Sequence, residues 1–164
     1  PSVNMGWNNN QKKTIATLAL DPTLWESAMV FQINRMGYNE HRWLDSGDVP
    51  NVQFLASVCE IARQTQDVMH WLPTREVKTL LAFIKQYGAD HIPSNLNIRV
   101  SAPMVNDKPL SAFDNMPQIT TSTVHDKHNA PQGHSCPARN QGNACGDCRA
   151  CWNSKVANVS YPIH

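Results

Sequence analysis

Short runs of β-branched and aromatic residues alternate along this chain with amphipathic helical patterns. Helices are expected over residues 22–36, 51–63 and 74–87, and strands over 41–45, 68–72, 96–100 and 118–124. Strands that alternate with helices form βαβ units, which build a parallel sheet with right-handed crossovers. The chain has 164 residues, whereas a closed eight-stranded barrel needs about 250. We therefore expect an α/β fold, either a partial (β/α) barrel or a small open parallel sheet.

Local signals define the first of these helices well. Asp21 is a good N-cap and is followed by Pro22, which suits the first helical position, while Gly37 is a natural stop. Trp25 and Ile33 lie on one helical stripe. Residues 102–116 show no helical pattern and contain proline, so we predict a long loop there.

The composition changes after residue 124. Residues 1–124 form the predicted βα core, whereas residues 125–164 hold four His and four Cys with few aliphatic side chains. Such a segment cannot build a core alone, so we expect an irregular metal-binding segment packed on the βα core. The net charge is +1 and no apolar run approaches the roughly 20 residues of a membrane span. The small net charge therefore predicts no long-range electrostatic attraction to nucleic acid. Because no apolar run is long enough, we also expect no membrane partner.

The cysteine spacing points to a metal centre. Cys136, Cys145, Cys148 and Cys151 fall close together, while Cys59 stands alone on a predicted apolar helix face and is expected to be a core thiol. Four thiolates suit either a tetrahedral zinc or a [4Fe–4S] cluster. The consecutive Cys-x-x-Cys-x-x-Cys run favours the cluster, and zinc remains the alternative. Clustered, unpaired thiols and the lack of a signal peptide suggest a reducing, cytoplasmic location.

Polar residues follow the predicted strands at the edge where parallel α/β folds form their sites. The first strand leads into Asp45, Ser46, Gly47 and Asp48. These residue types suit ribose hydroxyls, an amine or a cation. Asp48 has a second interpretation, as the cap of the next helix.

The later strands add further candidates. Arg75 lies at a helix start, where the dipole disfavours a cation, which indicates an anionic ligand. Ser101 ends the third strand and His125 follows the fourth. His125, His128 and His134 precede the cysteines and could complete a metal site, donate protons or be solvated loop residues. We expect a small-molecule ligand at these strand ends.

Two segments carry a resemblance to a known family. They are the run 42–48 (Arg-Trp-Leu-Asp-Ser-Gly-Asp) and the run 145–152 (Cys-Gly-Asp-Cys-Arg-Ala-Cys-Trp). On these motifs, and over most of its length, the chain resembles the bacteriophage family named for gene product eighty-eight. Members resemble compact radical-SAM proteins, so the resemblance implies a partial (β/α) barrel, a [4Fe–4S] cluster, S-adenosylmethionine as a ligand and a location in the host cytoplasm.

One departure from the family concerns a second cysteine motif that members usually carry near the N-terminus. The sequence begins just after the place where that motif would lie. We therefore expect either an upstream cysteine-bearing segment or a member that lacks this cluster.

Two functional hypotheses follow, and neither assigns a reaction or settles whether the chain is an enzyme. In the first, the four cysteines hold a [4Fe–4S] cluster in a protein related to radical-SAM proteins. A small ligand then faces four candidate catalytic residues, which are Asp45, Asp48, Arg75 and His125. The candidate binding residues are Ser46, Gly47 and Ser101.

In the second hypothesis the chain is a non-enzymatic phage accessory protein with a structural zinc. Its surface would bind a host or viral protein, or nucleic acid through basic residues near the cysteines, which are Lys127, Arg139, Arg149 and Lys155.

Overall fold

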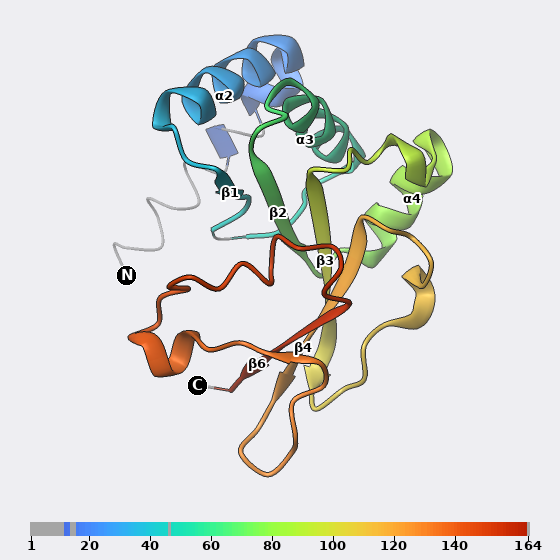
Figure 1. The fold of residues 1–164 in the computed structure, drawn as a ribbon. Helices are drawn as coiled ribbons and strands as arrows, with labels where there is room; N and C mark the ends of the chain where they lie inside the picture. Colours follow the sequence, from blue (N-terminus) through green and yellow to red (C-terminus); the bar gives the residue numbers. More distant parts are fainter. Residues whose placement is uncertain (1–11, 14–15, 46, 164) are drawn as a thin grey trace.

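The fold is built on one sheet of six parallel strands, in the order β1-β2-β3-β4-β6-β5 (Figure 1). We describe a computed structural model that covers residues 12–13, 16–45 and 47–163. The curled, unclosed sheet confirms the predicted α/β class. The strands are β1 (Glu40–Arg42), β2 (Met69–Thr74), β3 (Leu96–Val105), β4 (Ile119–His125), β5 (His134–Ser135) and β6 (Asn158–Pro162).

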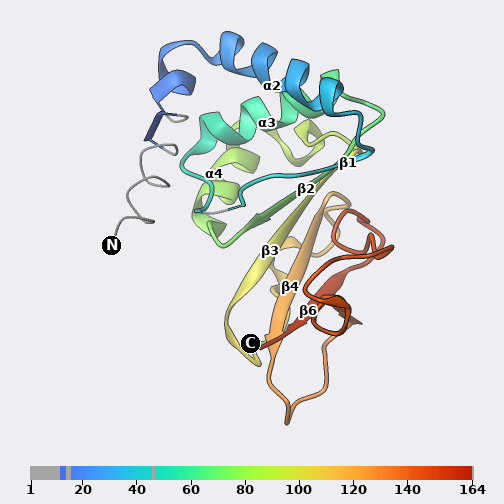
Figure 2. The ribbon, with the colours of Figure 1, turned by 90° about the vertical axis from the view of Figure 1, so that its left-hand side faces the viewer.

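Helices cover one face of this sheet, and the segment with the four cysteines covers the other (Figure 2). We call these the helix face and the cysteine face, and we call residues 136–157 the cysteine segment. The α-helices are α2 (Pro22–Met36), α3 (Val52–Gln64) and α4 (Val77–Tyr87), and residues 16–20 are also helical. Short 3-10 turns are η1 (Ala89–His91), η2 (Ser111–Phe113) and η3 (Ala138–Gln141).

The ends of α2 and α3 follow from side-chain caps. The Asp21 carboxylate accepts a hydrogen bond from the Leu24 amide at 2.9 Å, and Gly37 ends α2 with φ 65°. The Asn51 side chain accepts from the Phe54 amide at 2.9 Å at the start of α3. The predicted ends of α2 are therefore confirmed, whereas α3 is capped by Asn51 and not by Asp48.

Alternation along the strands separates the two faces. Leu72, Ile98 and Val100 point to the helix face, are fully buried and pack in one apolar cluster with the helices. The side chains between them, such as Trp71 and Arg99, point to the cysteine face. The sheet therefore holds an apolar core on one side and displays polar and aromatic groups on the other.

Two features of the strands differ from the sequence prediction. β3 continues to Val105, which pairs with Val124, so the predicted loop over 102–116 is wrong in its first four residues. A register shift after Ser101 accommodates Pro103. The C-terminal forty residues also supply β5 and β6, which the sequence did not indicate. Within the described part of the chain, no helix combines the length and the apolar character that a membrane crossing requires.

A chain of hydrogen bonds holds His70 neutral inside the helix-face core. The Trp43 indole N–H donates to His70 Nδ1 at 3.2 Å, and His70 Nε2 lies 2.8 Å from Thr65 Oγ1. The Thr65 hydroxyl itself donates to the Ile61 carbonyl at 2.8 Å. The imidazole therefore carries its proton on Nε2 and has no acceptor for a second proton. Burial, together with nearby His41, lowers the pKa of His70 to about 4.

This histidine makes the fold sensitive to mild acid. Its pKa is depressed in the folded state, so its contribution is complete above the unfolded value of about 6.5 and is lost as pH falls toward 4. We expect the free energy of unfolding to fall by about 2 kcal/mol between pH 7 and pH 5. Denaturant titrations at the two pH values measure it. His70→Gln should show a smaller difference, and an unchanged difference would contradict the assignment.

Candidate functional site

A pocket of about 380 Å³ opens on the cysteine face at the carboxyl ends of the strands. We call it the cysteine pocket because Cys136, Cys145 and Cys151 line it. Strands β1, β2, β3, β4 and β6 all contribute to its wall. The other lining residues are Arg42, Trp71, Pro73, Ser101, Ser122, Ala138, Arg139, Asn143, Tyr161 and Pro162.

Polar side chains of β3 anchor the cysteine segment to the sheet. The Asn97 amide donates to the Cys151 carbonyl at 2.8 Å, and the Arg99 guanidinium donates to the Ala150 carbonyl at 3.0 Å. Both side chains are buried. The backbone around Cys151 is therefore held by donors that the sheet itself presents.

Aromatic side chains add a second anchor. The Trp152 indole N–H donates to the His41 carbonyl at 3.0 Å, and its ring meets Trp71 edge-on at 5.1 Å between centroids. Arg149 pairs with Glu40 at 2.8 Å, but solvent screens this pair, so it is the weaker of the anchors. The anchors span β1, β2 and β3.

The four cysteines differ in their surroundings, although all five cysteines of the chain are free thiols. Cys145 is exposed, whereas Cys151 is buried and its sulfur lies 3.2 Å from the Tyr161 hydroxyl. Burial raises the pKa of Cys151, against the smaller opposing effects of Tyr161 and Arg99. Burial therefore disfavours the thiolate form of Cys151.

The remaining two ligand candidates are half-buried. The Cys136 amide donates to the Ser160 carbonyl at 2.9 Å, which ties this cysteine to β6. Cys148 does not line the pocket, and its sulfur lies 3.5 Å from His134 Nε2. His134 is thus the only one of the predicted histidines that contacts a ligand cysteine among the described residues.

The four clustered cysteines offer sulfur donors of the kind that both zinc sites and iron–sulfur clusters use. A tetrahedral zinc draws its sulfur ligands to about 2.3 Å from one point. Within residues 12–13, 16–45 and 47–163, no group of three or more His, Cys, Asp or Glu side chains is arranged so that it could hold a metal ion. An iron–sulfur cube binds each thiolate to a different iron and so needs sulfurs that surround a larger space. Cys136, Cys145 and Cys151 line one pocket, and Cys148 lies outside its lining.

The structure brings one of the predicted strand-end residues into the pocket. Ser101 lines it, and its hydroxyl lies 2.9 Å from that of Ser122 on β4. Asp45 is exposed outside the lining, with its carboxylate 3.8 Å from Arg42, which does line the pocket. Asp45 is therefore connected to the pocket only by its ion pair with Arg42.

Asp48 and Arg75 make structural contacts with their neighbours. The Asp48 carboxylate accepts from the Thr74 hydroxyl at 2.6 Å and from the Arg75 amide at 2.8 Å. The Arg75 guanidinium donates to the Pro103 carbonyl at 2.6 Å. Neither lines the cysteine pocket. Gly47 is exposed with φ 79°, and the prediction for Ser46 lies outside the described residues.

His125 lies beside the cysteine pocket. Its Nδ1 is 2.7 Å from the Ser160 hydroxyl, and it lines a separate pocket of about 180 Å³. Arg139 and Pro162 line both pockets, so the two are neighbours. His128 is exposed.

Sequence reasoning missed three residues of the site. Trp71 and Tyr161 provide aromatic walls, and Arg99 lies fully buried behind the cysteine segment. A signal for Arg99 was present, because this charged residue alternates with apolar residues inside the predicted strand 96–100. Parallel strands that are buried on both faces seldom carry a charge without a partner or a role.

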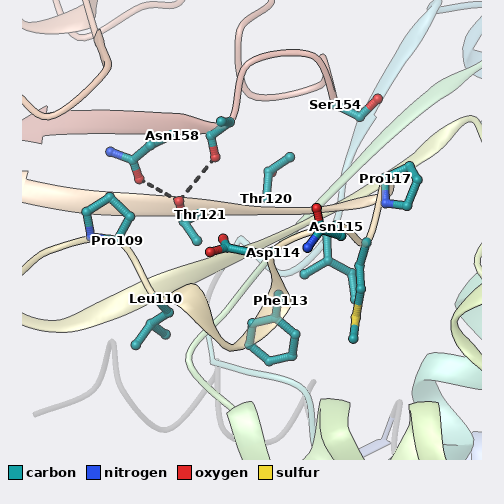
Figure 3. A pocket seen from close by; sticks show the side chains of 13 residues that line it. Pro109, Leu110, Phe113, Asp114, Asn115, Pro117, Thr120, Thr121, Ser154 and Asn158 are labelled. Atoms are coloured by element: carbon teal, nitrogen blue, oxygen red, sulfur yellow. Dashed lines mark hydrogen bonds between the residues drawn. The ribbon is translucent and has the colours of Figure 1, made fainter.

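A second pocket, of about 340 Å³, lies at the opposite edge, where β4 and β6 begin (Figure 3). Phe113 and Leu110 form its apolar side, and Thr121 donates to the Asn158 side chain at 2.9 Å on the other. No cysteine or histidine lines it. Three of the clustered thiols line the cysteine pocket instead.

Comparison with known protein families gives one match. The sequence profile of the family described as Gene product 88 matches residues 6–154. The chain belongs to the Gene product 88 family. The matched region of this Gene product 88 chain spans β1 to β5 and all four clustered cysteines. No curated protein and no solved structure gave a significant match.

Proposed function

We propose that this Gene product 88 protein binds a [4Fe–4S] cluster through Cys136, Cys145, Cys148 and Cys151. The observation that carries the proposal is the cysteine pocket, because three of these thiols line one space of about 380 Å³. The Cys-x-x-Cys-x-x-Cys spacing supports it independently. Cys148, half-buried beside the pocket, is the fourth ligand.

The surrounding residues have distinct roles in this proposal. Asn97 and Arg99 hold the backbone that carries Cys151. Trp71 and Tyr161 form walls that limit the access of water to the sulfur ligands. Such a cluster supplies one-electron transfer or an electrophilic iron. Ser101 and Arg42, on the same wall, are placed to bind a small anionic or hydroxylated ligand.

The proposal extends to a relationship with radical-SAM proteins, which the curled parallel sheet supports. S-adenosylmethionine is the ligand that such a relationship would bring. A cluster of this kind requires reduced thiols, which fits the proposed phage origin and a place in the cytoplasm of the infected cell.

Metal content tests the proposal directly. Full-length protein reconstituted anaerobically with iron and sulfide should become brown and hold about four irons and four sulfides per chain. A colourless protein that holds one zinc in preference to iron would overturn the proposal and support the structural-zinc alternative.

A matched pair of cysteine variants separates ligands from other thiols. Cys145→Ala should lose most of the iron and the visible absorbance, because an exposed pocket thiol is removed. Cys59→Ala should keep both, because Cys59 is buried on α3, where burial raises the pKa of its thiol to about 12. Iron and absorbance are measured per folded chain. Equal iron content in the two variants would contradict the assignment of Cys145.

A further inference from the structure

Arg99 is a fully buried arginine in the centre of the sheet. Its guanidinium donates to four backbone carbonyls, those of Thr121 at 2.6 Å, Ala150 at 3.0 Å, Val156 at 3.1 Å and Asn153 at 3.5 Å. Its Nε has no hydrogen-bond partner. Neutral carbonyls therefore solvate this cation incompletely.

No carboxylate in the described part of the chain pairs with this charge. The ion pairs among the described residues involve Arg42, Arg63 and Arg149, and none involves Arg99. The ionisable groups that act on it are the Cys151 thiol and the Tyr161 phenol. An unpaired buried charge costs several kcal/mol. We therefore expect an anion to balance the buried charge of Arg99 in the functional protein.

The position of Arg99 indicates which anion this is. The guanidinium lies between β3 and the backbone of residues 150–156, and Cys151 is the next residue after one of its acceptors. Cys151 lines the cysteine pocket. The charge therefore lies directly behind the wall that carries a proposed ligand.

We propose that Arg99 supplies the buried positive charge that balances the thiolate-bound iron–sulfur group and raises its reduction potential. The proposal rests on the proposed function, since it concerns the group held by the four cysteines. A four-thiolate cluster is anionic and gains one further negative charge on reduction. A fixed cation in a poorly solvated position stabilises the reduced form more than the oxidised form.

The test is an anaerobic dye-mediated redox titration of the reconstituted protein, followed by absorbance and by the electron paramagnetic resonance of the reduced state. Arg99→Gln removes the charge and keeps an amide donor for the carbonyls. It should lower the equilibrium constant for reduction at least tenfold, which is about 59 mV for one electron. Arg99→Lys keeps the charge and should remain within a few-fold of the wild type.

A distant arginine controls for the loss of net charge. Arg35 lies exposed in the last turn of α2, on the opposite side of the sheet. Arg35→Gln should leave the potential unchanged because solvent and salt screen it. An equal shift in Arg35→Gln and Arg99→Gln would overturn the proposal.

A second variant leaves the guanidinium in place. Thr120 is buried and lies opposite Arg99 in the β3–β4 register. Thr120→Asp adds a carboxylate beside the cation and should lower the potential in the same direction as Arg99→Gln. An unchanged potential in both folded variants would overturn the proposal even though the cluster binds. Failure of the wild type to take up a cluster would instead overturn the proposed function.

Discussion

Replacing Leu72 by alanine is expected to lower the free energy of unfolding by about 3 to 4 kcal/mol. Leu72 is fully buried on β2, in the apolar cluster between the sheet and the helices. Alanine leaves a cavity there, and neighbouring strands limit how far it can collapse. Its chain neighbours Trp71 and Pro73 both line the cysteine pocket. We therefore expect a lower iron content as well, measured beside denaturant unfolding at pH 7.

The same substitution at Leu81 is the control. Leu81 lies on α4 with 44% of its surface exposed. Leu81→Ala should cost less than about 1 kcal/mol and leave iron content unchanged. Similar losses of stability at Leu72 and Leu81 would contradict the description of the helix-face core.

Replacing Gly133 by alanine is expected to cost about 3 kcal/mol. Gly133 has φ 87°, a conformation that side chains disfavour, and an added Cβ would lie 2.7 Å from the Asn158 carbonyl oxygen. That oxygen belongs to the backbone at the start of β6, so it cannot move aside. The substitution should separate β5 from β6 and displace Cys136, which follows β5. Unfolding measurements and iron content report the two effects.

Gly37→Ala separates two contributions to the cost of replacing Gly133, namely the close contact of the added Cβ and the positive φ of the backbone. Gly37 has φ 65° and nothing within 4 Å of an added Cβ. This variant should cost only about 1 kcal/mol and keep its iron. A cost at Gly133 no larger than at Gly37 would show that the β5–β6 contact does not constrain the fold.

Local chemistry explains which parts of the fold could be predicted. Helix α2 begins and ends where Asp21 and Gly37 indicate, because caps act within a single turn. Strand β6 was missed because its run, Asn-Val-Ser-Tyr-Pro, lacks a strong strand pattern. It is held in the sheet by pairing with β4, for example of Thr121 with Asn158. Such pairing depends on the whole sheet and leaves no local signature.

The candidate site shows the same division. The cysteine spacing identified the four ligand candidates, because closely spaced thiols are typical of metal centres. The sequence could not predict that Ser101 lines the cysteine pocket, whereas Asp48 accepts a hydrogen bond from the Arg75 amide and Arg75 donates to the Pro103 carbonyl. Strand ends that are equivalent in sequence point in different directions. Arg99 became meaningful only when its position behind Cys151 was known.

The strand order has a consequence for where the cysteines lie. From β1 to β4 each new strand is added on the same side, and the connections through α3, α4 and the η2 loop lie on the helix face. From β5 to β6 the chain steps in the reverse direction. A right-handed crossover in the reverse direction must pass over the opposite face. The handedness of one connection therefore delivers the cysteine segment to the face without helices, and a crevice forms where the direction of winding changes.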